Sequence, residues 1–505
     1  MRVDGTAGRP EGPGPDAGPR PGPRAVLARV RFLPEVAVSV LLLVPCFWQS
    51  RIQAGDLLSH IYNAWLAREI QRGTVEGLTL TTPWTNVLFD FWLVWLLRLC
   101  GPAAAQRIAV AAAVLIFTWG AFLLISRVNG RRAWPLMPCI AVLAYGWVFH
   151  AGLFNFYLSL GLCLWALALW WRPWPLGVAA AGLVLGLAWL AHALPVVWAV
   201  GAAVYLRLAE RLPTRVRLLL LASAAGAVGA MSWALTRFYP HSWDSSQVLL
   251  ILGVDQVWVY GRHYLWLSLS LLLVWTLFGA RLVEEYGWSR LLVGVPFHWL
   301  ALTSFGILLT PGRLDLSGYH HALVFVAQRM SLAAGVLICV ILGAARPPRW
   351  MKVAAMAVAA AYFICLWKDT RELNALEDRM ELAVGHLPAR QRVVSAVCRS
   401  GERLCWATAH LIDRVCIDRC YSYANYEPST GQFRVRALQD NPVVVSSYGD
   451  SWELQNGTYR VRPRDLPLFQ VYTCGPLGDA FCVRELAVGE VAAVACQSRA
   501  AGESP

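Results

Sequence analysis

Long apolar runs without charged residues recur along most of this chain. A run of roughly 17–25 such residues is long enough to cross a bilayer as a helix. Of the 505 residues, 57% are hydrophobic and 15% are charged, whereas a soluble domain has about 25% charged residues. We therefore predict a mainly α-helical protein, a polytopic transmembrane helical bundle, rather than a soluble core.

Eleven spans are predicted, with a first span at about Val30–Trp48 and a last at Trp350–Trp367. The run Val87–Leu99 is too short to span comfortably, so it is predicted to be a re-entrant or interface-parallel helix. The other nine spans are predicted at Ala103–Ile125, Trp134–Phe149, Phe154–Trp171, Leu176–Ala191, Ala193–Leu208, Leu218–Phe238, Tyr264–Ala280, Leu291–Thr310 and Leu323–Ala344.

Positive charge gathers in alternate loops between these spans, which the positive-inside rule places in the cytoplasm. These loops and the Arg-rich N-terminus explain the net charge of +13 without a nucleic-acid partner. We predict a multi-pass protein of the inner (plasma) membrane, with a cytoplasmic N-terminus and everything after Trp367 outside. The loops contain Arg127/Arg131/Arg132, Arg172, Arg207/Arg211/Arg215/Arg217, Arg281/Arg290 and Arg346/Arg349/Lys352.

Three regions follow from composition: a disordered tail at 1–29, a transmembrane domain at 30–367 and a small α+β extracytoplasmic domain at 368–505. In the third, Glu372–Leu382 is predicted to be a helix. Strands are predicted at Arg392–Val397, Gln432–Ala437, Pro442–Ser446 and Phe469–Tyr472.

Cysteines are concentrated in the C-terminal region, which holds seven of the 13. Two or three disulfides are typical of an oxidising extracytoplasmic compartment. The alternative is zinc, because the spacing of Cys416 and Cys420 resembles that of metal ligands. The seven are Cys398, Cys405, Cys416, Cys420, Cys474, Cys482 and Cys496.

Asp56 follows the first span directly and starts a predicted amphipathic helix. Its carboxylate suits a general base toward an acceptor hydroxyl, or a ligand for a divalent cation such as Mg²⁺ or Mn²⁺. His60 lies four residues later, on the same helical face, and is the second catalytic candidate. The alternative is that Asp56 only caps the helix, since Asp is a preferred N-cap residue.

Two outer turns carry further candidates for substrate binding. Asn155 and Tyr157 follow one turn and are suited to hydrogen-bonding a sugar or a phosphate. Their alternative role is structural, with Asn155 in the turn and Tyr157 in the interfacial aromatic belt. His192 lies at another outer tip, where it is either a ligand or only part of a helix break.

A third outer loop holds Arg313, His320 and His321, and Arg329 follows inside an apolar run. A charge there needs a partner or a ligand. Guanidinium binds phosphate at two points, so we predict that this group holds a donor phosphate. The alternatives are a structural ion pair for Arg329, or snorkelling to the interface, and a metal for the two histidines.

The layout resembles that of the bacterial polytopic GT-C-type glycosyltransferases over most of residues 30–370. The likeness rests on a single span followed by Gly55-Asp56, an interface helix, many further spans and an extracytoplasmic C-terminal domain. The turns Gly152-Leu-Phe-Asn155-Phe-Tyr157 and His192-Ala-Leu-Pro195 are similar too.

This resemblance implies a sugar transfer from a polyprenyl-phosphate donor to an acceptor hydroxyl on the outer face, with Asp56 as general base. Membrane lipid is then a partner, and the acceptor is unknown. The alternative is a non-enzymatic transporter or an assembly scaffold for lipid-linked intermediates. No phosphate-binding loop, dinucleotide fingerprint, zinc-protease motif or nucleophile elbow is found in the sequence.

Overall fold

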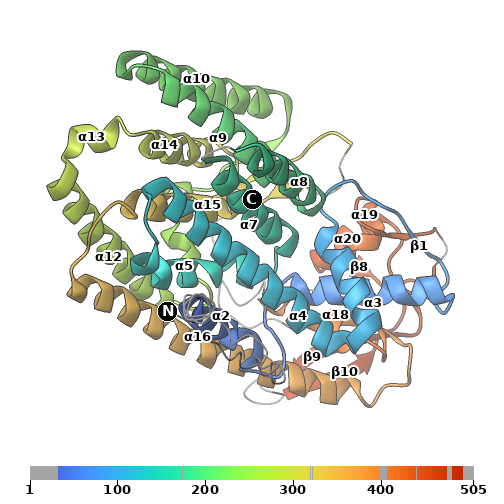
Figure 1. Ribbon diagram of the computed structural model, residues 1–505. Helices are drawn as coiled ribbons and strands as arrows, with labels where there is room; N and C mark the ends of the chain where they lie inside the picture. Colours follow the sequence, from blue (N-terminus) through green and yellow to red (C-terminus); the bar gives the residue numbers. More distant parts are fainter. Residues whose placement is uncertain are drawn as a thin grey trace, which may run out of the picture. The chain divides into compact units, whose positions relative to one another are not determined.

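The computed structural model describes residues 32–171, 174–318, 320, 322–397, 407–439, 441–474 and 480–492 (Figure 1). The chain divides into two compact units, Met1–Val44 and Pro45–Pro505. The helix α2 (Leu33–Phe47) begins in the first unit. All contacts discussed below lie within the second unit, which contains the apolar helices after α2 and the C-terminal region after Lys368.

Helices form most of the described chain, as predicted. After α2 come α3 (Leu57–Arg72), α4 (Leu88–Asn129), α5 (Met137–Ala144), α6 (Trp147–His150), α7 (Phe154–Trp171), α8 (Pro175–Ala191), α9 (Ala193–Arg211), α10 (Thr214–Phe238), α11 (Gln247–Leu250), α12 (His263–Tyr286), α13 (Trp288–Leu292), α14 (Val295–Leu308), α15 (Val326–Leu342), α16 (Arg349–Val384), α18 (Leu411–Val415), α19 (Tyr426–Thr430) and α20 (Tyr448–Gln455). Short 3₁₀ turns are η1 (Trp134–Leu136), η2 (Val254–Val257) and η3 (Pro463–Asp465).

Six of the described helices are long and apolar enough to cross a membrane: α4, α7, α9, α10, α12 and α16. Shorter apolar helices lie at Leu33–Phe47, Trp134–His150, Pro175–Ala191, Val295–Leu308 and Val326–Leu342. Every span predicted from the sequence overlaps one of these helices. The total of eleven crossings stays a prediction.

Helix α4 contains a sharp break at Gly101, where the backbone has φ 76° and ψ 171°. Pro102 follows and has no N–H to continue the helical hydrogen bonds. The segment before the break corresponds to the predicted interface helix, and the segment after it to the predicted span. The predicted boundary between them coincides with this break, although the two pieces form one kinked helix.

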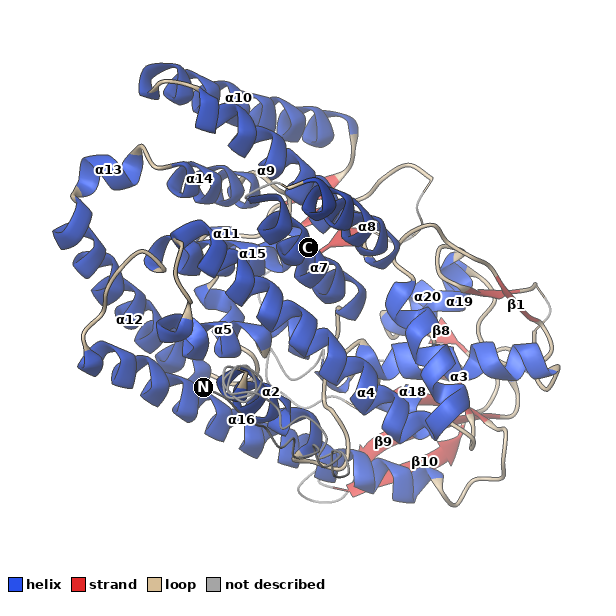
Figure 2. Cartoon of the chain, in the orientation of Figure 1, coloured by secondary structure: helices blue, strands red, loops and turns tan. Residues whose placement is uncertain are grey.

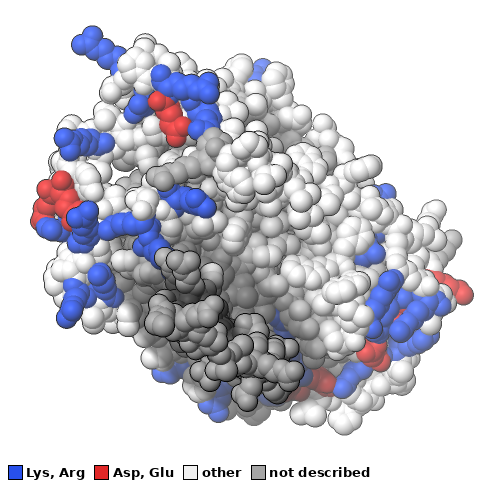
Figure 3. All heavy atoms as spheres, viewed as in Figure 1, with Lys and Arg blue, Asp and Glu red and all other residues white. Residues whose placement is uncertain are grey.

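Two contacts join segments of the predicted basic loops to one another. Arg131 Nε donates to the carbonyl of Gly343 over 2.9 Å, which joins the loop after α4 to the loop after α15. Arg217 similarly reaches the carbonyl of Val293 over 3.3 Å. On the face drawn in Figure 3, charged side chains gather over α10 and α13 and again around α3, while the surface over α7 and α8 is almost uncharged.

The C-terminal region is α+β and shares a sheet with the first loop. Figure 2 shows most strands gathered around α3 and α18. A four-stranded sheet has the order β10-β9-β5-β6, in which β5 runs parallel to both neighbours and β9 pairs antiparallel with β10. These strands are β5 (Arg392–Ala396), β6 (Tyr421–Ser422), β9 (Leu468–Cys474) and β10 (Ala480–Glu485).

Smaller sheets join distant segments. In the first loop, β1 (Leu78–Leu80) pairs antiparallel with β7 (Val435–Ala437). The other strands are β2 (His241–Ser242), β3 (Arg313–Leu314), β4 (Leu323–Val324), β8 (Tyr459–Arg460) and β11 (Val491–Ala492), paired as β2-β3-β4 and β11-β8. The strand predicted at Pro442–Ser446 is absent, because Asn441 bends this segment by accepting hydrogen bonds from the backbone N–H groups of Val443 and Val444.

Two disulfides are formed, Cys416–Cys420 and Cys474–Cys482. The first pair is thus a disulfide rather than half of a zinc site. Cys398, Cys405 and Cys496 lie outside the described residues. The predicted helix Glu372–Leu382 proves to be the last part of α16, which continues unbroken from the final predicted span.

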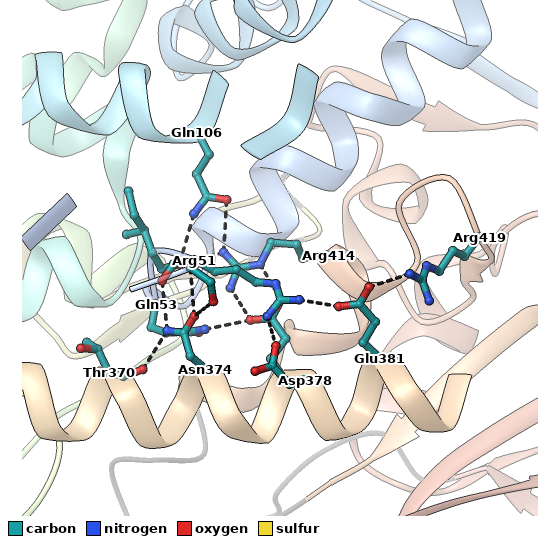
Figure 4. Close-up of polar contacts among 12 residues, drawn as sticks. Arg51, Gln53, Gln106, Thr370, Asn374, Asp378, Glu381, Arg414 and Arg419 are labelled. Carbon is teal, nitrogen blue, oxygen red and sulfur yellow. Dashed lines mark hydrogen bonds and ion pairs between the residues drawn. The ribbon is translucent and has the colours of Figure 1, made fainter. Parts of the chain in front are cut away.

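A buried ion pair fastens the C-terminal region to α16. Arg414 from α18 donates through Nε to Glu377 over 2.7 Å, and the two side chains are 8% and 1% exposed. Gln53 donates to the same carboxylate over 2.8 Å, and Arg414 also reaches the carbonyl of Ile52 over 2.7 Å. Figure 4 shows how the first loop, α16 and α18 meet around these groups.

We expect Arg414→Met to destabilise the fold by about 3–5 kcal/mol, because it leaves Glu377 buried without its main counter-charge. The double variant Arg414→Met/Glu377→Met should recover most of this loss. Denaturant titration of the purified protein in detergent measures the free energy of unfolding of both variants. The matched control is Arg419→Met, which removes a half-exposed partner of Glu381 and should cost about 1 kcal/mol or less. Equal losses for Arg414→Met and Arg419→Met would contradict the assignment.

Candidate functional site

The backbone at Asp56 is held by the turn between α6 and α7. The N–H of Asp56 donates to the carbonyl of Ala151 over 3.0 Å, and that of Gly55 to His150 over 2.8 Å. Gly152 has φ +81°, and a Cβ there would lie 2.4 Å from the backbone nitrogen of Asp56. Only glycine allows this approach without a backbone shift, so the turn fixes where Asp56 stands.

The carboxylate of Asp56 does not cap its helix. Asp56 occupies the N-cap position of α3 but has helical backbone angles and makes no side-chain cap hydrogen bond. Its Oδ1 instead lies 3.3 Å from Nε2 of His410, at the start of α18. The other ring nitrogen of His410 lies 2.9 Å from Asp413 Oδ2. One imidazole therefore bridges two carboxylates.

This bridge sets the charges of both partners. Burial alone would lower the pKa of His410, but its hydrogen bonds to Asp413 and Asp56 and their charges raise it to about 10. Burial would raise the pKa of Asp56, but the hydrogen bond and charge of His410, aided by His60 and Arg329, bring it below its usual value. At neutral pH, His410 is a cation and Asp56 a carboxylate.

His60 belongs to a second charged pair beside the first. Its Nδ1 lies 2.6 Å from Asp90 Oδ1, near the start of α4. Asn155 donates to the other oxygen of Asp90 over 2.9 Å and accepts from the backbone N–H of Phe89. Burial opposes the charge on His60, but Asp90, Glu427 and Asp56 raise its pKa to about 9. His60 is thus a cation that acts through its charge on Asp56 rather than by contact.

Glu427 in α19 is a buried carboxyl group with the opposite behaviour. Its side chain approaches the Ser59 hydroxyl at 3.5 Å. Burial raises its pKa to about 8. The charge of His60 lowers this pKa, and the charges of Asp90 and Asp56 offset part of that lowering. At neutral pH the group is mainly protonated, so it can donate as well as accept a hydrogen bond.

Arg329 and His192 meet on the other side of the cluster. Arg329 Nη1 lies 3.4 Å from His192 Nε2. The N–H of Leu194 donates to His192 Nδ1 over 3.2 Å, so the neutral ring carries its proton on Nε2. Two donors therefore face each other, and Arg329 Nε is buried without a hydrogen-bond partner among the described residues. Such an arrangement lacks an acceptor and suits an anion.

The remaining predicted residues have other contacts. Tyr157 is fully buried, and its hydroxyl donates to the carbonyl of Ala144 over 2.9 Å. Arg313 pairs with exposed Asp315 at 2.9 Å. His320 Nδ1 donates to the carbonyl oxygen of Thr430 over 3.0 Å, and its ring stacks on Tyr448. His321 lies outside the described residues. The structure thus joins Asp56, His60, Asn155, His192 and Arg329 in one cluster. Tyr157, Arg313 and His320 make the separate contacts given above.

A metal site does not fit the side chains that the structure describes. No group of three or more His, Cys, Asp or Glu among them is arranged to hold an ion. The nearest charged neighbour of Asp56 is the His410 cation, which would repel a divalent ion. We derive no step through a metal.

Four residues of the cluster were missed by sequence reasoning: Asp90, His410, Asp413 and Glu427. Asp90 carried a usable signal, because it is a lone carboxylate at the start of an apolar run. The other three lie more than 350 residues from Asp56 in a region without a known motif. Their proximity depends on tertiary packing, for example on the hydrogen bond that the backbone N–H of Ser422 donates to the Tyr62 hydroxyl over 2.9 Å.

Comparison with known proteins adds no family assignment: no family model, curated protein or solved structure matches this chain.

The raised pKa of His410 predicts a particular pH dependence of stability. A histidine whose pKa rises on folding stabilises the fold fully below its unfolded pKa, near 6.5, and loses this contribution as pH rises through the folded value, about 10. Each unit of difference corresponds to about 1.4 kcal/mol. The unfolding free energy of wild type minus that of His410→Asn should therefore be largest near pH 6 and shrink toward pH 10. A difference that grows with pH would contradict the bridge.

Proposed function

We propose that this protein is a membrane glycosyltransferase that moves a sugar from a polyprenyl-phosphate donor to an acceptor hydroxyl, with Asp56 as general base. The observation that carries the proposal is the pair of unsatisfied donors, Arg329 and His192, close enough to the ionised Asp56 for the guanidinium to lower its pKa. A phosphate binder and a proton acceptor at one site are what such a transfer needs.

The proposed orientation supports this role. The basic loops, two pairs of which are in contact, would face the cytoplasm. Asp56 packs instead with the C-terminal region, whose two disulfides are typical of an oxidising compartment. We therefore place the site on the extracytoplasmic side of the inner membrane, where a lipid-linked donor can enter laterally.

The chemistry balances with one carboxylate. The acceptor oxygen forms a bond to the anomeric carbon, and the bond from that carbon to the phosphate oxygen breaks. Its electron pair stays on the polyprenyl phosphate, whose added charge Arg329 and the Nε2–H of His192 would stabilise. The acceptor proton passes to Asp56 and then to water.

The low pKa of Asp56 is compatible with this step. A transition state at an anomeric carbon has oxocarbenium character, so the acceptor hydroxyl becomes strongly acidic as its oxygen bonds to that carbon. A weakly basic carboxylate can then take the proton. His410 and His60 keep Asp56 ionised beforehand, which gives them positioning and electrostatic roles.

Replacing Asp56 by Asn should reduce transfer by about 10²–10⁴-fold, because the amide cannot accept the proton. The assay incubates purified protein with a panel of polyprenyl-phospho-sugars and detects transfer or hydrolysis. Asp378→Asn is the matched control, since it makes the same change at a carboxylate that is 57% exposed, and it should keep full activity. Full transfer by a folded Asp56→Asn protein would refute the mechanism.

Replacing Arg329 by Met should weaken binding of polyprenyl phosphate without a sugar by at least about tenfold, since one charge-assisted contact contributes roughly 1.5–3 kcal/mol. Arg329→Lys should recover only part of the affinity, because an ammonium lacks the two-point geometry. Arg262→Met, which removes an exposed arginine before α12, is the control. Unchanged binding of the lipid phosphate by Arg329→Met would remove the phosphate assignment. Calorimetric titration in detergent measures each case.

A further inference from the structure

A pocket opens beside His60, on the side of α3 that faces the segment from Glu427 to Val435. It contains about 360 Å³ of empty space, a figure that includes open solvent. Its main side chains are His60, Asn63, Asn86, Asp90, Glu427, Phe433 and Arg434.

The walls offer both donors and acceptors. Asp90 is held in place by His60 and Asn155 and presents carboxylate oxygens. Arg434 lies over the ring of Phe91 at 4.5 Å, and its Nη1 is buried without a hydrogen-bond partner among the residues that the structure describes. The carboxyl group of Glu427 also lines the pocket. Its hydrogen bond from the Ser59 hydroxyl is long, at 3.5 Å.

The charges around the pocket compensate one another. His60 pairs with Asp90, and Asp90 also acts electrostatically on Arg434. An anionic ligand would meet the carboxylate of Asp90, and a cationic ligand would meet Arg434 and His60. Either would be repelled by one side of the pocket. A neutral ligand with several hydroxyl groups can use donors and acceptors of both kinds.

The apolar part of the wall fits the same class of ligand. Phe433 lines the pocket beside these polar groups and packs edge-on against Tyr426 at 5.7 Å. Asn86 lines it from a turn with φ +58°, a left-handed conformation that asparagine adopts more readily than most residues with a side chain. An aromatic face next to closely spaced carboxyl, amide and guanidinium groups matches a sugar ring, which has apolar C–H faces and a polar rim.

We infer that this pocket is the acceptor subsite and that it binds a neutral carbohydrate unit, so that the acceptor is a glycan rather than a peptide. This rests on the proposed function, because it assigns one side of the same site. His60 and Glu427 belong both to the pocket and to the surroundings of Asp56. A sugar seated there would hold a hydroxyl close to the proposed base.

The test is ligand binding without any donor lipid. The full-length protein in nanodiscs is mixed with a panel of neutral methyl glycosides and short neutral oligosaccharides, and binding is followed by saturation-transfer NMR and calorimetry. We expect at least one saccharide to bind, and Phe433→Ala and Arg434→Met each to weaken it about tenfold, the equivalent of one buried contact. Glu427→Gln should bind nearly as wild type, because an amide also donates and accepts, whereas Glu427→Ala should not.

Controls separate this inference from the proposed function. Asp56→Asn should bind the saccharide as wild type does even though transfer is lost, and Arg262→Met should be unchanged in binding. Any of three results would overturn the acceptor assignment. The whole panel fails to bind, peptides bind in preference to saccharides, or the affinity of a bound saccharide is unaffected by Phe433→Ala and Arg434→Met. Those results concern the pocket alone, whereas the proposed transferase is tested by Asp56 and the lipid phosphate.

Discussion

The buried pair between Arg414 and Glu377 is the interaction on which the candidate site depends. Glu377 lies on α16, a single helix that extends from the basic-loop end to the C-terminal sheet (Figure 1). Arg414 belongs to the same short helix as Asp413, and His410 precedes that helix directly. A buried ion pair is stable only when its geometry is well satisfied. Here Gln53, Gln106 and the carbonyl of Ile52 complete the hydrogen bonding. The position of His410 against Asp56 therefore follows from how α18 is fastened to α16.

The features that were predictable from the sequence are those encoded locally. Apolar runs located the helices, and the short run Val87–Leu99 set apart the first segment of α4, because hydrophobic length acts over a few residues. Asp56 was found for the same reason. Local reasoning left open whether it caps α3 or does chemistry. The structure shows an uncapped helix and a carboxylate turned toward His410. That contact joins segments about 350 residues apart, and neither composition nor spacing contains it.

The same limit explains the mixed outcome for the basic residues. Arg313 and Arg329 were equal candidates for a phosphate, since each is an arginine near an outer loop. Arg313 has a carboxylate two residues away in sequence, and the two pair on the surface. Arg329 has no carboxylate two residues away, and its Nη1 donor faces the Nε2–H donor of His192. An arginine with a local counter-charge is satisfied by its own loop, whereas one held in place without an acceptor retains its capacity for a ligand.

Two carboxyl groups in one cluster differ in protonation at neutral pH: Asp56 is ionised, and Glu427 is mainly protonated. Asp56 is in contact with a cationic imidazole that is itself held by Asp413, so its charge is compensated. Glu427 is buried near Asp90 and Asp56, whose charges oppose its ionisation, so ionising it would place a further negative charge beside theirs. Environments that push two pKa values apart define an acceptor and a donor of protons at the same pH. In the proposed transfer, Asp56 would take the proton, and Glu427 would offer a hydrogen bond to the acceptor that loses it.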